Sequence, residues 1–101
     1  MVDSEKLKIL IGEFRQLDIN DPAASEYWEA FIEELGSENE AIKFLSEAND
    51  EDLYILSSVF DDLSLKFQSN KFIEFLKDLQ KKHPAADMKL DIEFAEKALT
   101  N

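Results

Sequence analysis

The chain has 101 residues and carries 23 acidic against 11 basic side chains, which gives a formal net charge of -12. It contains no cysteine, and this excludes disulfides, thiolate metal sites and cysteine nucleophiles. Two glycines and two prolines are too few for the many tight turns of a β-sandwich or barrel. The composition therefore predicts a single all-α domain over residues 1–101, with helices joined by short links.

The excess negative charge is confined to the middle of the chain. Residues 18–62 hold 14 acidic residues and a single base, Lys43, whereas residues 63–101 hold six acids and seven bases. A surface of this kind repels nucleic-acid phosphates and anionic lipid head groups, and it attracts basic proteins. We therefore expect a basic protein as partner, and neither nucleic acid nor a membrane.

The N-terminal region shows no pattern of export or membrane insertion. Its charges begin within the first eight residues, and its continuous apolar run is limited to Ile9, Leu10 and Ile11. This run is too short for a secretory signal, and no stretch of the chain approaches the roughly 18 to 20 apolar residues of a membrane span. We expect a cytoplasmic protein.

Apolar spacing and capping residues predict about six short helices. The first covers residues 4–17, and Asp21 followed by Pro22 is a start signal for the second. Gly36 is suited to end the second helix. Ser37 and Glu40 form a capping box that opens the third, and Asn49 and Asp50 close it and cap the next.

The fourth predicted helix, residues 50–67, has the widest apolar face. Its apolar residues recur at intervals of three and four and are Leu53, Ile55, Leu56, Val59, Phe60, Leu63 and Phe67. A face wider than the usual arc of roughly 100° is typical of a helix with neighbours on two flanks. We therefore expect one continuous helix at the centre of the core.

Two further helices are predicted over residues 71–82 and 87–99, the first after a polar link at residues 68–70 and the two separated at Pro84. Short links favour antiparallel helical hairpins. The segment 41–45 is also similar to the segment 72–76, at a separation of 31 residues. This leaves two architectures open, a short α-solenoid of the HEAT kind and a compact helical bundle.

The sequence offers little for catalysis or cofactor binding, and we expect no enzyme, no cofactor and no metal. His83 is the only histidine and precedes a proline among lysines, where solvent exposure is expected. Glycine-rich phosphate loops, HExxH, EF-hand loops and Glu-x-x-His pairs are all missing from the sequence. The adjacent acids Asp61 and Asp62 would have to share a cleft, but neighbouring helix positions diverge by about 100°.

The candidate partner-binding residues lie on the second helix and on the outer face of the central helix. They are Glu26, Tyr27, Glu29 and Glu33 on the former, and Asp50, Tyr54, Ser58, Asp61 and Asp62 on the latter. Asp61 and Asp62 gain little from the helix dipole, so they are either solvated or used by a partner. A tyrosine beside acids is typical of an interface hot spot. Trp28 lies in the apolar arc of the second helix, and core packing is expected for it.

In size, charge and helical segmentation, the chain resembles the small acidic immunity proteins with which bacteria neutralise cationic nuclease toxins. The resemblance implies inhibition by occlusion, with carboxylates standing in for substrate phosphates in the basic cleft of the toxin. The main alternative is a small helical-repeat adaptor or regulatory domain whose groove holds a partner peptide. A second alternative is a domain whose acidity serves only solubility.

Overall fold

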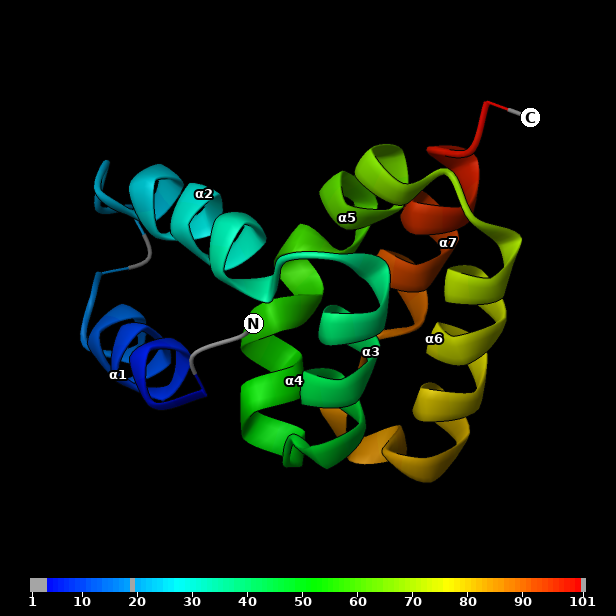
Figure 1. Cartoon of the computed structure of the whole chain (residues 1–101). Coiled ribbons are helices and arrows are strands. Elements are labelled where there is room, and N and C mark those ends of the chain that lie inside the picture. The colour runs from blue at the N-terminus through cyan, green and yellow to red at the C-terminus, as the bar shows by residue number, and fades with distance from the viewer. Residues whose placement is uncertain (1–3, 19, 101) are drawn as a thin grey trace.

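The computed structural model describes residues 4–18 and 20–100, and within these ranges the regular secondary structure is entirely helical (Figure 1). Its elements, in order, are α1 Ser4–Arg15, α2 Ala24–Leu35, α3 Glu38–Glu47, α4 Asp50–Leu56, the 3-10 helix η1 Ser57–Val59, α5 Phe60–Phe67, α6 Asn70–Lys82, the 3-10 helix η2 Pro84–Ala86 and α7 Lys89–Lys97. The predicted all-α class is confirmed. Among the described residues, no helix combines the length and apolarity of a bilayer-spanning segment.

The helices form a compact bundle. Figure 1 shows the α1–α2 pair on one side, α3 and α4 in the middle, and α6 and α7 on the other side. Helix α2 contacts α3 and η1, α3 contacts α6, and α5 packs most extensively against α7. The Cα radius of gyration is 12.7 Å, close to the roughly 13 Å expected of a compact domain of this length. Of the two predicted architectures, the structure therefore has the bundle.

The predicted caps between the middle helices are present. The backbone N–H of Glu40 donates to the Ser37 hydroxyl, and the Glu40 carboxylate accepts from the Ser37 N–H, both at 3.3 Å. Asn49 Oδ1 accepts the N–H of Asp52 at 2.9 Å. Gly36 ends α2 with a φ of 70°, a conformation that glycine adopts without steric cost. These local bonds fix the two short turns that reverse the chain on either side of α3.

Several boundaries differ from the predictions. Helix α1 ends at Arg15 rather than at residue 17, and α7 ends at Lys97 rather than at residue 99. Helix α2 begins at Ala24 rather than at Pro22, because Asp21 accepts the N–H of Ala23 in a turn before the helix. The last segment is divided between η2 and α7, with Asp87 between them in the left-handed region at a φ of 53°. Aspartate tolerates this conformation better than most residues.

The prediction of one continuous central helix over residues 50–67 is wrong. α4 and α5 are separated by η1, where three residues form a tighter 3-10 turn. The Ser57 and Ser58 hydroxyls donate to the carbonyls three residues earlier, at 2.6 and 2.8 Å. Such bonds compete with the helical ladder and bend helices. The two consecutive serines account for the change of helix type.

The central segment nevertheless supplies the middle of the core, as its apolar face predicts. Its side chains with no exposed surface are Leu53, Leu56, Val59, Phe60 and Leu63. Around them lie buried residues of the other helices, including Leu7, Phe31, Leu45, Phe72, Leu76, Met88 and Ala95. Every described helix therefore contributes to one apolar cluster.

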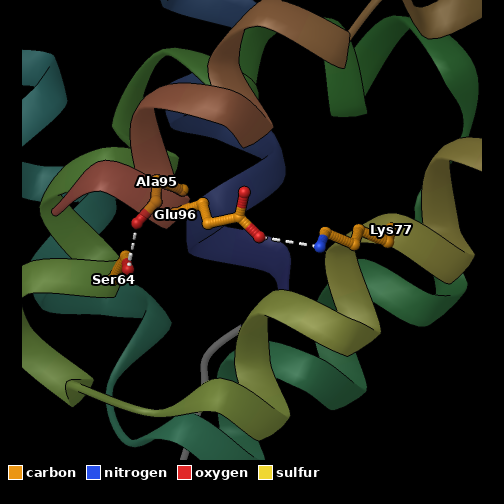
Figure 2. A network of polar contacts seen from close by, with 4 residues as sticks. All are labelled: Ser64, Lys77, Ala95 and Glu96. Carbon is orange, nitrogen blue, oxygen red and sulfur yellow. Dashed lines mark hydrogen bonds and ion pairs between the residues drawn. The ribbon is translucent and has the colours of Figure 1, made fainter. Parts of the chain in front are cut away.

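Polar contacts join α7 to α5 and to α6. Figure 2 shows the Ser64 hydroxyl donating to the Ala95 carbonyl at 2.6 Å, and Lys77 of α6 paired with Glu96 at 2.7 Å. One turn further along, the Gln68 amide donates to the carbonyl of Ala98 at 3.1 Å. The first bond joins Ser64 to Ala95, and the second joins the later residues Gln68 and Ala98. Since residue numbers increase together in both segments, α5 and α7 run in the same general direction. The intervening helix α6 returns the chain between them.

Truncation of the central segment should destabilise the fold strongly. Leu56→Ala and Phe60→Ala each remove a side chain with no exposed surface. We expect each to lower the free energy of unfolding by roughly 2–5 kcal/mol, measured by chemical denaturation followed by circular dichroism. Neutral effects from both variants would show that this segment is not the centre of the core.

The hydroxyl of Ser64 is expected to contribute to stability. Ser64→Ala removes a buried hydroxyl bond to the Ala95 carbonyl, which keeps only the 3.2 Å bond from the Ala98 N–H, and this should cost roughly 1 kcal/mol in thermal or chemical unfolding. Ser46→Ala is the matched control, since that hydroxyl is exposed and donates to the Lys43 carbonyl at 2.8 Å, and its effect should stay within about 0.5 kcal/mol. Equal effects of the two substitutions would contradict a specific role of the buried bond.

Candidate functional site

The predicted residues of α2 form an exposed acidic surface. Glu26, Glu29 and Glu33 are solvent exposed, and within the described ranges they take part in no ion pair. Their spacing of three and four places them on one helix face. Like charges at such spacing repel each other by a few tenths of a kcal/mol, so this face is mildly unfavourable for the isolated chain.

Tyr27 has a more structural environment than its neighbours on α2. Its ring is half-buried, with the Phe14 ring edge-on at 6.1 Å and the Phe31 ring at 6.4 Å. Its hydroxyl donates to Glu13 of α1 at 3.4 Å. Burial and the nearby Glu13 carboxylate raise the pKa of Tyr27, so the phenol stays neutral at physiological pH. Tyr27 therefore helps to hold α1 against α2.

The predicted residues of the central segment lie in different surroundings. Asp50 pairs with the Nδ1 atom of His83 at 2.7 Å, and Tyr54 is 62% exposed. Asp61 and Asp62 lie at the start of α5, both exposed. Burial, and then the charge of Asp61, raise the pKa of Asp62.

An open groove lies between the α1–α2 pair and the rest of the bundle, with a volume of about 890 Å³. Its wall on the hairpin side comes from α1, α2 and the turn that joins them, and the opposite wall comes from α4, η1, η2 and α7. The lining residues are Phe14, Arg15, Leu17, Asp18, Ala24, Trp28, Asp50, Glu51, Tyr54, Ile55, Ser57, Ser58, Ala85, Asp87 and Asp91. Three aromatic rings and five carboxylates thus meet in one depression.

The groove divides the predicted site residues into two groups. Asp50, Tyr54 and Ser58 line it. Glu26, Tyr27, Glu29, Glu33, Asp61 and Asp62 lie outside it. The structure therefore presents two acidic surfaces, the groove and the exposed faces of α2 and α5, where the sequence suggested one.

Two expectations about single residues need correction. Trp28 was expected in the core but is 39% exposed and lines the groove. The neighbouring glutamates Glu26 and Glu29 were the available signal. His83 was expected in solvent, yet its side chain is 25% exposed and is held by Asp50.

The groove also contains acids that the sequence did not single out. Asp87 and Asp91 belong to the last third of the chain, where acids and bases nearly balance. The net charge of that segment therefore gave no sign of an acidic surface. Their separation of four residues was a weak signal, since only the tertiary fold places them in the same groove as Tyr54 and Trp28. They extend the acidic lining to η2 and α7.

Two carboxylates at one end of the groove have a basic side chain as partner, whereas those at the α7 end have none within the described ranges. Arg15 pairs with Glu51 at 2.7 Å, and His83 holds Asp50. Of the described residues that line the groove, Arg15 is the only base. Asp87 and Asp91 take part in no ion pair within the described ranges.

Asp91 is the lining carboxylate whose surroundings oppose its charge most clearly. It is half-buried on α7, and burial raises its pKa above the usual 3.8. The carboxylates of Asp61 and Asp87 add to the rise, and the neighbouring Ser57 hydroxyl offsets it in part. A cation placed beside Asp91 would relieve this unfavourable interaction.

Side chains that commonly bind metal ions do not cluster within the described ranges. No group of three or more histidine, aspartate or glutamate side chains among the described residues is placed to hold a metal ion. The single histidine, His83, contacts Asp50 through its Nδ1 atom at 2.7 Å. The groove offers a ligand carboxylates and aromatic rings.

Comparison with known proteins identifies no relative of this chain. No protein-family model, curated protein or solved structure matches the chain. Function is therefore argued from the charges and contacts of the two acidic surfaces.

Replacing Asp91 should stabilise the protein at neutral pH. Because the pKa of Asp91 is raised in the folded chain, the wild type loses stability as the pH rises from 3.8 through the folded value. Asp91→Asn lacks this titration, so its Tm should exceed that of the wild type at pH 7, and the advantage should vanish at lower pH. Melting curves recorded from about pH 3 to pH 8 measure the difference. Glu93→Gln, at an exposed position of the same helix, is the control, and a lower Tm for Asp91→Asn at neutral pH would contradict the analysis.

Proposed function

We propose that this protein is a protein-binding module that neutralises a basic partner, in the manner of an immunity protein that inhibits a cationic toxin such as a nuclease. The observation that supports the proposal most directly is the set of exposed, unpaired carboxylates on α2 and α5. Glu26, Glu29 and Glu33 lie on one face of α2, and Asp61 and Asp62 open α5. None of them is in an ion pair within the described ranges.

Electrostatics gives such a surface a preference among partners. The summed field of these carboxylates attracts a cationic protein and speeds its association, whereas it repels polyanions and anionic lipid. Against the basic cleft of a nuclease, the carboxylates occupy the positions of substrate phosphates. Inhibition would then follow from occlusion of the cleft, without any chemistry by this chain.

The groove supports a second candidate, a small adaptor or regulatory domain that holds a peptide of its partner. An open depression of about 890 Å³ with exposed aromatic side chains is of the size that peptide or ligand sites have. This alternative predicts binding without inhibition of the partner's own activity. An activity assay on the captured partner therefore separates the two candidates.

Charge reversal on the exposed acidic faces tests the proposal. A pull-down with the full chain as bait, read by mass spectrometry, should recover a basic protein. Glu33→Lys and Asp61→Lys should each weaken its binding by roughly 1–3 kcal/mol and leave the Tm nearly unchanged, because both side chains are exposed. Association with the wild type should also slow as salt is raised from low to physiological concentration.

The controls are matched reversals at Glu74, Asp78 and Glu93, which are exposed acids of α6 and α7. These should change affinity far less. Equal losses from both sets would mean that total charge, rather than a particular face, governs binding. Losses confined to the control set would place the interface on α6 and α7, and salt-independent affinity would contradict the electrostatic proposal.

A further inference from the structure

The groove exposes apolar surface that the fold itself does not use. Tyr54 is 62% exposed and Trp28 is 39% exposed, and both line the same depression with Phe14 and Ile55 beneath the rim. Aromatic side chains placed in this way offer a large contact area at low conformational cost. A ligand that enters the groove would cover them.

The charge of the groove restricts what the ligand can be. Five lining carboxylates face one lining base, and Arg15 is already engaged by Glu51. The remaining carboxylates at the α7 end, Asp87 and Asp91, have no cation beside them in the described chain. An acidic peptide, a nucleic acid or an anionic head group would meet this end with like charge.

The pair formed by Arg15 and Glu51 shows what kind of group the groove accommodates. The Arg15 Nη2 atom of α1 lies 2.7 Å from the Glu51 carboxylate of α4, so this pair joins the two walls of the groove. A basic side chain thus already lies in the groove at one end. At the α7 end, the carboxylates of Asp87 and Asp91 have no such basic partner within the described ranges.

We propose that the groove is the docking site of a basic segment of the partner protein. In this arrangement a lysine or arginine side chain lies against Asp87 and Asp91, and an adjacent apolar side chain packs on Trp28 and Tyr54. The inference deepens the proposed function and rests on it, because it takes the basic character of the partner from there. It adds that the groove, rather than the outer faces of α2 and α5, holds the segment that anchors the partner.

The single tryptophan of the chain provides a reporter for this site. Because Trp28 lines the groove, its fluorescence reports occupancy of the groove and of no other surface. A segment packed on the indole should shift its emission to shorter wavelength and protect it from quenching by acrylamide. Binding to the outer acidic faces alone should change neither property.

Selection from a phage-displayed library of random short peptides, with the full chain as target, tests the proposal. Enriched peptides should carry lysine or arginine next to an apolar residue, and a synthetic copy should protect Trp28. Tyr54→Ala and Asp91→Asn should each weaken the peptide by about 10-fold or more. Leu65→Ala and Glu93→Gln are the matched controls, an apolar residue 57% exposed and an acid on the exposed face of α7, and should stay within about 2-fold. Thermal melting of all four variants verifies that they are folded.

The outcomes separate this inference from the function on which it rests. Basic peptides that leave Trp28 unprotected but lose affinity with Glu33→Lys and Asp61→Lys would overturn the groove as docking site and retain the acidic surface as the binding face. Enrichment of neutral or acidic peptides, or no enrichment, would overturn both. Protection of Trp28 together with the expected losses at Tyr54 and Asp91 supports both.

Discussion

Burial of five apolar side chains of the central segment is the constraint on which the rest of the structure depends. Leu53 and Leu56 from α4, Val59 from η1, and Phe60 and Leu63 from α5 have no exposed surface. Burial of each such side chain is worth roughly 1.5–3 kcal/mol relative to exposure, so neighbours are required around the whole segment. α2 and α7 both contact η1, α7 covers α5, and η2 lies against α4. The bundle is the arrangement in which all of these contacts are made at once.

The 3-10 turn within this segment determines how the outer surface is divided. Since Ser57 and Ser58 bond back to the preceding turn, α5 does not continue the helical phase of α4. Tyr54 and Ser58 consequently lie in the groove, while Asp61 and Asp62 do not. In one continuous helix, Tyr54, Ser58 and Asp61 would share a face. In the structure they belong to two surfaces, the groove, which is aromatic and acidic, and the exposed face of α5, which is acidic.

Both surfaces carry charge that folding does not need. The glutamates of α2 repel one another, and Asp91 is held where burial disfavours its ionised form. A lysine beside these acids would offset their charge. Lys77, for example, is instead paired with Glu96 of the adjacent helix α7. Natural proteins retain such unfavourable local features chiefly at functional sites. Under the proposed function, the partner supplies the missing positive charge.

The amino-acid sequence by itself determined the helical class, the caps at Ser37 and Asn49 and most of the core, because these depend on spacing and on bonds between near neighbours. It also located the excess charge in the middle of the chain. The break at η1 depends on a competition between serine hydroxyls and the helical ladder, which apolar periodicity does not register. The groove was decided only by the tertiary structure, since it joins α1, α2, α4 and α7, and the exposure of Trp28 and the roles of Asp87 and Asp91 follow from that packing. Periodicity shows which face of a helix is apolar, whereas the tertiary fold decides how much of that face its neighbours cover.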